Sequence, residues 1–181
     1  RLHHLVLVPH PYPEIQRHAV LNAMRVASVK AAVYLAQASG AQRPATTEVF
    51  DLSGPSSQER EGLPRVAYIG QVHAHQHGTE VDEHILYGGN TRGMMPLPMH
   101  PNEWLDGAVV VSYSYGARGL ETYYQQNHPI ITELYRLHQA RELTFIGTIA
   151  TTSSVLQEEL TRNPMLAAQL AKWNLGADGG I

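Results

Sequence analysis

Short apolar runs alternate along the chain with longer segments in which hydrophobic residues recur at helical spacing. Uniformly apolar runs are typical of strands buried on both faces of a parallel sheet. Strands are therefore predicted at Leu5–Val8, Thr46–Leu52, Arg65–Val72, Ala108–Tyr113 and Leu143–Ile149. Helices are predicted at Glu14–Gln37, Asn102–Leu105, Pro129–His138 and Gln157–Trp173, the last open to interruption at Pro164. This alternation predicts a single α/β domain over residues 1–181, with a mostly parallel open sheet flanked by helices.

The final residues, Leu175–Ile181, read LGADGGI and follow the last predicted helix. Glycines at this position are typical of a turn that ends a helix. A further strand is expected to begin at Ile181. We therefore expect a second chain to complete the sheet, and the present chain to be a fragment or subunit of a larger precursor.

Composition narrows the classes of partner and chemistry. The 181 residues contain 13 Lys and Arg and 16 Asp and Glu, for a formal net charge of −3. Nucleic acid is not an expected partner, because no basic stripe is present to neutralise a phosphate backbone. A membrane span is not expected either, since no apolar run approaches about 20 residues. The chain has no cysteine, which excludes disulfides, thiolate metal ligands and a cysteine nucleophile within it. A cytoplasmic location is expected.

The predicted strand Arg65–Val72 leads directly into the densest group of potential metal ligands. His73, His75 and His77 stand at alternate positions. The imidazole and acidic residues that follow are Glu80, Asp82, Glu83 and His84. Neutral imidazole and carboxylate are the usual ligands of zinc-class divalent metals. The loop also follows a strand end, where α/β sheets bind their ligands. The sequence therefore predicts a metal or substrate site in this loop.

Strand geometry limits how many of these histidines can share one ion. Residues i and i+2 of an extended chain point to the same face about 6.6 Å apart. His73 and His77 would then be about 13 Å apart unless the chain bends. Two histidines completed by Glu80, Glu83 or His84 would leave one position open for catalysis. Two other interpretations remain open: a solvated loop whose imidazoles bind backbone carbonyls, and an acid–base role near pKa 6.5.

Two histidines elsewhere precede predicted helices. His100 could reach the same edge of the sheet and contact a substrate. The alternative for this segment is structural, with Asn102 capping a helix and Trp104 packed in the core. Likewise, Asn127 or His128 is expected to cap the next helix.

Tyr115 and Arg118 follow the predicted strand Ala108–Tyr113, at the same edge of the sheet. The planar guanidinium of Arg118 could hold a substrate carboxylate through two parallel hydrogen bonds. An aromatic-rich interface is an equally open interpretation of this loop.

Several motifs together carry a resemblance to a known family. The order RVAYIGQVH, ILYG, LPMHPNEWLDGAVV, NHPIITELYRLH, ELTFIGTIATT and LGADGGI extends over most of the chain. It resembles component B of the glycine, sarcosine and betaine reductases, and in particular its precursor-type subunit. DGAVV, NHPIITELYRLH and LGADG are fairly specific in combination, although each alone is weak.

The resemblance implies a mechanism that needs more than one chain. A precursor of this type is cut in two, and the cut converts a cysteine into a pyruvoyl group at the start of the second chain. The pyruvoyl carbonyl forms a Schiff base with the substrate amine. A selenol or thiol of a partner subunit then attacks the adjacent carbon and releases the amine. The resemblance places Ile181 near the end of the smaller, upstream chain. Because this chain has no cysteine, its pyruvoyl group would belong to a partner from the same precursor or operon.

We therefore expect a subunit of a hetero-oligomeric reductase that helps to bind a small amine or amino acid for reductive C–N cleavage. The first alternative is a metal-dependent hydrolase or lyase, with zinc, iron or nickel in the histidine loop. The second is a non-catalytic scaffold subunit. The candidate catalytic residues are His73, His75 and Glu83; the candidate substrate-binding residues are Arg118, Tyr115 and His100; and the candidate metal ligands are His73, His75, His77, His84 and Glu80.

Overall fold

The structure, a computed structural model, describes residues 5–15, 17–40, 43, 45–53, 61–73, 86–87, 91, 93–109, 125–153 and 156–181. Contacts divide the chain into two units, residues 1–48 and 49–181, and each is described by itself. Within the described residues, no helix is long and apolar enough to cross a membrane.

In the described part of the first unit, residues Arg17–Ser39 form helix α1. Its alanine-rich sequence has high helix propensity, and the predicted helix at Glu14–Gln37 is confirmed with its bounds shifted. The predicted strand Leu5–Val8 is wrong, because that segment is irregular and its side chains are exposed. An apolar run becomes a strand only where a partner strand receives its backbone hydrogen bonds.

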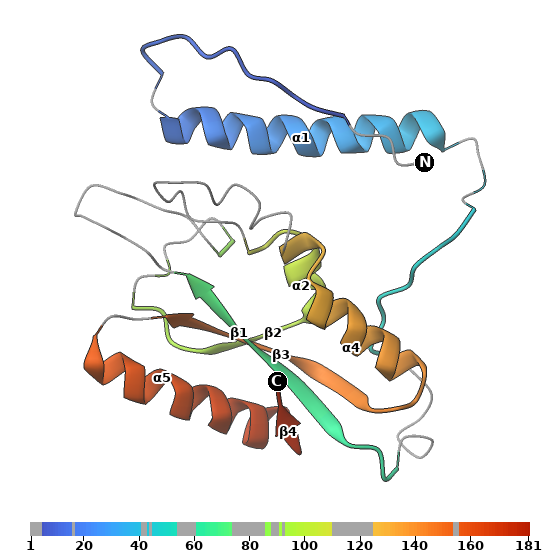
Figure 1. Cartoon of the computed structure of the whole chain (residues 1–181), viewed down its shortest axis with the longest axis vertical. Coiled ribbons are helices and arrows are strands. Elements are labelled where there is room, and N and C mark those ends of the chain that lie inside the picture. Colours follow the sequence, from blue (N-terminus) through green and yellow to red (C-terminus); the bar gives the residue numbers. More distant parts are fainter. Residues whose placement is uncertain are drawn as a thin grey trace. The chain divides into compact units, whose positions relative to one another are not determined.

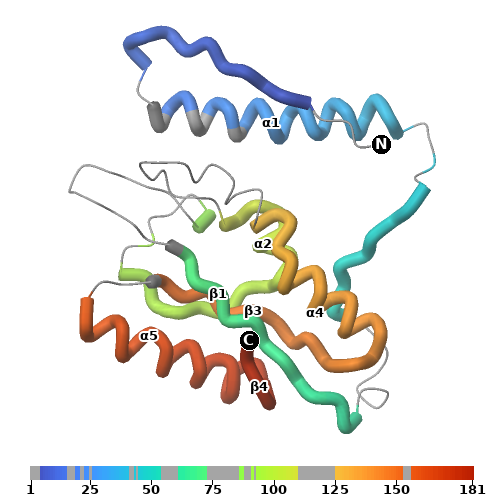
Figure 2. Tube along the Cα trace, viewed as in Figure 1, coloured from blue at the N-terminus to red at the C-terminus, as the bar shows by residue number. Residues whose placement is uncertain are grey.

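The second unit holds the described sheet, which is open and has four strands in the order β2-β3-β1-β4. The strands are β1 at Arg65–His73, β2 at Leu97–Met99, β3 at Thr144–Ser153 and β4 at Gly179–Gly180. β1 pairs in parallel with both β3 and β4, whereas β2 pairs antiparallel with β3. β1 and β3 lie side by side along their length (Figure 2). The predicted α/β fold with a mostly parallel open sheet is confirmed.

Helices cover both faces of this sheet (Figure 1). They are α2 at Pro101–Leu105, α4 at Pro129–Gln139, α5 at Gln157–Gln169 and a π-helical turn, η2, at Leu170–Asn174. α2 and α4 lie on one side of the sheet and α5 on the other. The predicted interruption at Pro164 is wrong, because α5 continues through that residue.

The side chains of β1 alternate strictly between the two faces, as the pleat of a strand requires. Val66 and Tyr68 pack into the core under α2 and α4, whereas Ala67 and Ile69 belong to the core under α5. Burial of these apolar side chains on both faces is the main stabilising term of the fold.

β3 contains one extra residue relative to β1, which shifts the pairing of the two strands. Val66 pairs with Phe145, but its neighbour Ala67 pairs with Gly147, so Ile146 is a bulge. Gly147 has a φ of 138°, which disfavours any side chain. Phe145 packs into one core and Ile146 into the other, and the register shift then pairs Ile149 with Ile69, which lies in the same core.

Two other predicted strands, Thr46–Leu52 and Ala108–Tyr113, do not form regular strands in the described residues. Thr46–Leu52 is wrong as a strand: it is irregular, although Phe50 packs edge-on against Tyr135 with ring centroids 5.4 Å apart. Of Ala108–Tyr113, residues 110–113 lie outside the described residues. Val109 is buried and forms a single antiparallel bridge with Leu86.

The LGADGGI segment is held by the first residue of β1. The guanidinium of Arg65 donates from Nε to the carbonyl of Gly176 (2.8 Å) and from Nη2 to that of Leu175 (3.0 Å). The backbone N–H of Arg65 donates to the carboxylate of Asp178 at 2.9 Å. The strand that was predicted to begin at Ile181 begins earlier, as β4, and Ile181 extends its pairing through hydrogen bonds with Ala67 and Ile69.

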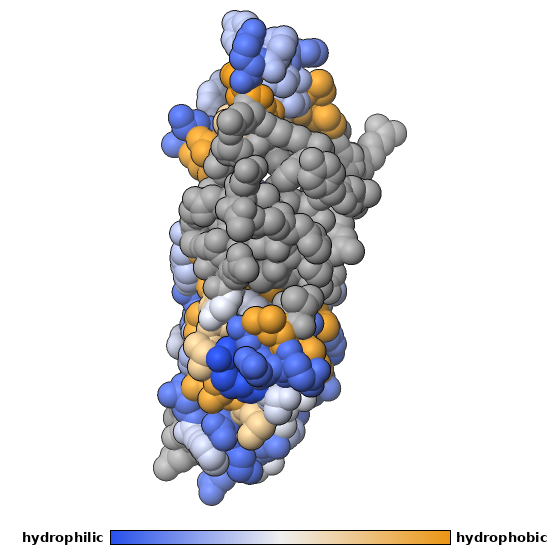
Figure 3. Space-filling model, turned by 90° about the vertical axis from the view of Figure 1, so that its left-hand side faces the viewer, coloured by the Kyte–Doolittle hydropathy of each residue, from blue (hydrophilic) through white to orange (hydrophobic). Residues whose placement is uncertain are grey.

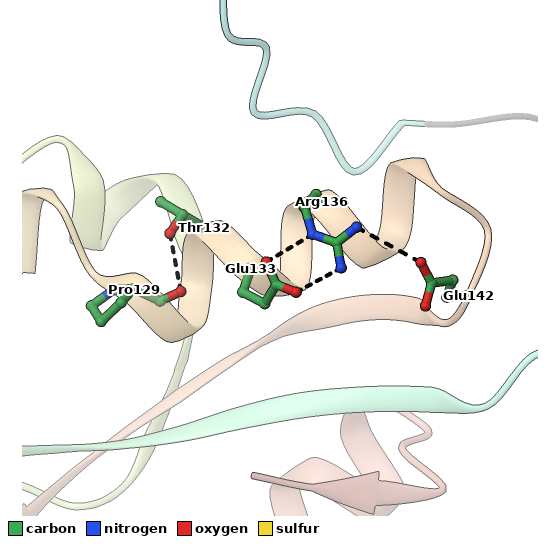
Figure 4. A network of polar contacts seen from close by, with 5 residues as sticks. All are labelled: Pro129, Thr132, Glu133, Arg136 and Glu142. Atoms are coloured by element: carbon green, nitrogen blue, oxygen red, sulfur yellow. Dashed lines mark hydrogen bonds and ion pairs between the residues drawn. The ribbon is translucent and has the colours of Figure 1, made fainter.

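The outer surfaces of α4 and α5 are polar with scattered apolar residues. On α4, Arg136 makes two hydrogen bonds to the Glu133 carboxylate and an ion pair with Glu142 at 3.8 Å (Figure 4). Exposed pairs of this kind contribute little stability. Leu156 and Leu160, near the start of α5, are exposed. The lower part of the view in Figure 3 shows hydrophilic and hydrophobic residues mixed on one face.

Candidate functional site

The carboxyl ends of the two central parallel strands meet at one edge of the sheet. The last residue of β1, His73, pairs with Ser153, the last residue of β3. Ligands of open α/β sheets bind beyond such ends. The backbone therefore places His73 where the sequence predicts a site.

The remaining residues of the predicted histidine site lie outside the described residues. These are His75, His77, Glu80, Asp82, Glu83 and His84. Tyr115 and Arg118 also lie outside them. Their catalytic, metal-binding and substrate-binding roles remain predictions. Among the described residues, no group of three or more His, Cys, Asp or Glu side chains is placed to hold a metal ion.

His100 has a structural task at the start of α2. Its Nδ1 accepts a hydrogen bond from the backbone N–H of Asn102 at 3.2 Å, and its own N–H donates to the Glu103 carboxylate. The two bonds form a capping box. A helix cap with a packed Trp104 was expected here, and Trp104 is 1% exposed. The capping residue is His100, however, and not Asn102. Substrate binding by His100 remains a prediction.

His128 links the start of α4 to the middle of β1. As expected for a cap, its Nδ1 accepts a hydrogen bond from the backbone N–H of Ile131, at 3.4 Å. Its Nε2 lies 2.9 Å from the hydroxyl of Tyr68. Because Nδ1 acts as the acceptor, a neutral ring carries its proton on Nε2 and donates it to the Tyr68 oxygen. Burial lowers the pKa of His128, which favours this neutral form.

Trp104, a residue of α2, packs against Tyr68 and His128 and completes this group of polar and aromatic side chains. Its indole N–H donates to the Thr148 hydroxyl at 2.9 Å, and Thr148 in turn donates to the carbonyl of Met99 at 2.7 Å. The Trp104 ring meets those of Tyr68 and His128 edge-on, with centroids 5.8 and 6.1 Å away. Every polar atom of Trp104 and Thr148 thus has a partner, as a buried polar group requires.

The sequence pattern alone does not connect these residues. Tyr68 and Thr148 were seen only as strand positions, and His128 only as a cap. The period-two alternation of β1 could have assigned Tyr68 to an inner face. No local pattern, however, brings β1 next to a helix cap 60 residues further along the chain. The arrangement fixes α2 and α4 on one face of the sheet.

The lowered pKa of His128 predicts a loss of stability in acid. An unfolded histidine takes up a proton near pH 6.5, whereas the buried ring resists it. The unfolded state therefore binds more protons as the pH falls below about 6.5, and the free energy of unfolding decreases. In the variant His128→Asn this decrease should be smaller, because asparagine can cap the helix but does not titrate. Urea unfolding of both proteins between pH 5 and pH 8 measures the difference. Parallel pH profiles would contradict the prediction.

Comparison with known proteins decides the family. Residues 1–181 match the family described as glycine/sarcosine/betaine reductase component B subunits. The chain belongs to this family. Within the family it is 29% identical over 180 residues to the glycine reductase complex component B subunits alpha and beta of Acetoanaerobium sticklandii, a match that covers 98% of this chain and 41% of the relative. The predicted resemblance to reductase component B is confirmed.

Other members of the component B family show the same extent of match. The chain is 32% identical over 163 residues to the betaine reductase complex component B subunit alpha of Peptoclostridium acidaminophilum, covering 88% of this chain and 36% of the relative. It is 28% identical over 176 residues to the sarcosine reductase complex component B subunit alpha of the same organism, covering 96% and 40%. The chain thus spans about two fifths of the length of these relatives. No solved structure matches it.

Proposed function

We propose that this chain is a subunit of a hetero-oligomeric reductase of the component B type, and that it helps to bind a small amine or amino acid for reductive C–N cleavage. The observation that supports this most is the family match over residues 1–181. The sheet adds a physical reason, because its parallel strands end together at His73 and Ser153, where such sheets bind ligands.

The chemistry proposed for this chain is binding and proton handling. A pyruvoyl group, if present, must come from a partner chain, because this chain has no cysteine; it would supply a carbonyl able to condense with the substrate amine. His73, His75 and Glu83 would accept or donate protons at that amine. Arg118 would hold a substrate carboxylate, with Tyr115 and His100 beside it. A selenol- or thiol-bearing subunit would complete the reaction.

Alanine at His73 tests the proposal in the reconstituted complex. Removal of a positioned acid or base lowers turnover typically by about 100-fold or more. We expect such a decrease in amine release by His73→Ala, while His10→Ala, at an exposed position of the first unit, serves as the control. Unchanged turnover in a variant with alanine at His73, His75 and His77 would support a scaffold role instead.

A divalent metal is a second cofactor that we propose for the same loop, because neutral imidazole and carboxylate suit zinc, iron or nickel. Its ligands would be two of His73, His75 and His77, together with Glu80 or His84. Elemental analysis of the purified protein and of His75→Ala tests this. A stoichiometric metal lost in the variant would favour metal-dependent hydrolase or lyase chemistry. Folded, active protein without metal would contradict it.

A further inference from the structure

The two edges of the described sheet differ in how they meet a neighbouring strand. At one edge, β2 contains Pro98, which has no backbone N–H to offer, and Pro96 precedes the strand directly. Proline is one of the usual devices that protect a sheet edge from another strand. At the other edge, β4 consists of Gly179 and Gly180, both exposed. Gly179 and Gly180 bring no proline, no charge and no bulky side chain to this edge.

One residue of β4 has backbone hydrogen-bonding groups that point away from β1. Ile181 donates its N–H to Ala67 and accepts from Ile69, so both of its polar groups face β1. Successive residues of a strand point their N–H and C=O groups to opposite sides. The N–H and C=O of Gly180 therefore point away from β1, at the edge that β4 forms in Figure 1.

Two observations favour this edge as a binding surface for another polypeptide. Arg65 and Asp178 hold the approach to β4 through hydrogen bonds of 2.8–3.0 Å, so the strand is held in register by a defined clamp. Trp173, at the end of η2 shortly before β4, is 74% exposed. Exposed tryptophan is costly on a free surface and is enriched at the energetic centres of protein interfaces.

We propose that the outer edge of β4 receives an extended strand from the rest of component B, which extends the sheet by backbone pairing at Gly180. The occupant is inferred from the relatives, of which this chain spans about two fifths, and the inference rests on the proposed function. Strand addition at an exposed edge is a common mode of polypeptide recognition. The exposed Trp173, six residues before β4 in the sequence, is the side chain that we expect to contact the incoming segment.

A proline at Gly180 tests the pairing, with alanine at the same position as a matched control. Both variants add a Cβ, which lies 3.3 Å from the flexible end of Ile69 and at ordinary contact distance, 3.8 Å, from the carbonyl oxygen of Ala67. Only Gly180→Pro removes the outward N–H. The chain is co-expressed with the polypeptide that matches the remainder of component B. Native mass spectrometry and size-exclusion chromatography then measure the affinity of the complex. We expect Gly180→Ala to assemble like the native chain, and Gly180→Pro to bind about tenfold more weakly, the loss expected for one hydrogen bond.

The possible results separate the two proposals. If the native complex forms and Gly180→Pro assembles equally well, the strand-pairing proposal is overturned and the proposed function stands. If no second polypeptide associates with the native chain, both proposals fail. A dimer of this chain alone that protects the Gly180 amide from hydrogen exchange would also overturn the pairing with component B. Weaker assembly of Trp173→Ala, without loss of its own stability, would support the proposal independently.

Discussion

Replacing Trp104 with alanine is expected to lower the free energy of unfolding by about 3–5 kcal/mol, the range for removal of a large buried aromatic side chain. The indole is 1% exposed and packs against Tyr68 and His128. Its loss would leave a cavity between α2 and the sheet. It would also remove the hydrogen bond that the indole N–H makes to Thr148. Urea unfolding followed by circular dichroism measures the change.

The second tryptophan of the chain provides the control for this prediction. Trp173 is 74% exposed, so Trp173→Ala should change the stability of the isolated chain by no more than about 0.5 kcal/mol. Trp104→Phe, which keeps most of the ring volume, should cost about 1–3 kcal/mol through the lost hydrogen bond and the smaller ring. Equal effects of alanine at the two tryptophans would contradict the packing described for Trp104.

Gly70→Ala is expected to destabilise the chain by about 1–3 kcal/mol, although the change adds a single methyl group. Gly70 is buried in β1 and faces the same aromatic group. A Cβ there would lie 2.5 Å from Cη2 of Trp104 and 2.7 Å from Cε1 of Tyr68. Since close-packed interiors tolerate little added volume, either ring must move and weaken its contacts. The thermal unfolding midpoint measures the loss.

The matched control for Gly70 is Gly179→Ala. A Cβ at Gly179 meets no atom within 4 Å, so the same chemical change should alter stability by no more than about 0.5 kcal/mol. If both alanine variants were equally stable, the close approach of Trp104 and Tyr68 to β1 would be wrong.

The parts of the fold that could be predicted are those in which local pattern and tertiary pairing agree. β1 and α4 were expected almost at their observed bounds, since β1 contains the apolar run Val66–Ile69 and α4 begins with proline. Leu5–Val8 is apolar throughout, and Thr46–Leu52 contains Val49, Phe50 and Leu52, but neither segment forms a strand. The local sequence shows which residues are hydrophobic. A strand also needs a neighbouring strand to pair with, and a short stretch of sequence does not show whether one is present.

Of the predicted site, the structure describes only the backbone of its first residue. His73 was expected at a carboxyl edge of the sheet, and its parallel pairing with Ser153 lies there, whereas the rest of the motif lies outside the described residues. The contact between Tyr68 and His128 could not be predicted, because it joins a strand to a helix cap through the tertiary fold alone. His100 shows the opposite case. Its local spacing to Glu103 matched a capping box, but the imidazole had been considered only as a possible substrate contact.

The clamp between Arg65 and the LGADGGI segment also has a consequence for the order in which the chain folds. Arg65 and Gly176, which it binds, are 111 residues apart. Closing so long a loop costs entropy that is recovered only when the contact forms. During synthesis, β1 therefore remains without its β4 neighbour until nearly all of these 181 residues have been made. During that time the unpaired edge of β1 is exposed, and a chaperone or a partner subunit would have to cover it.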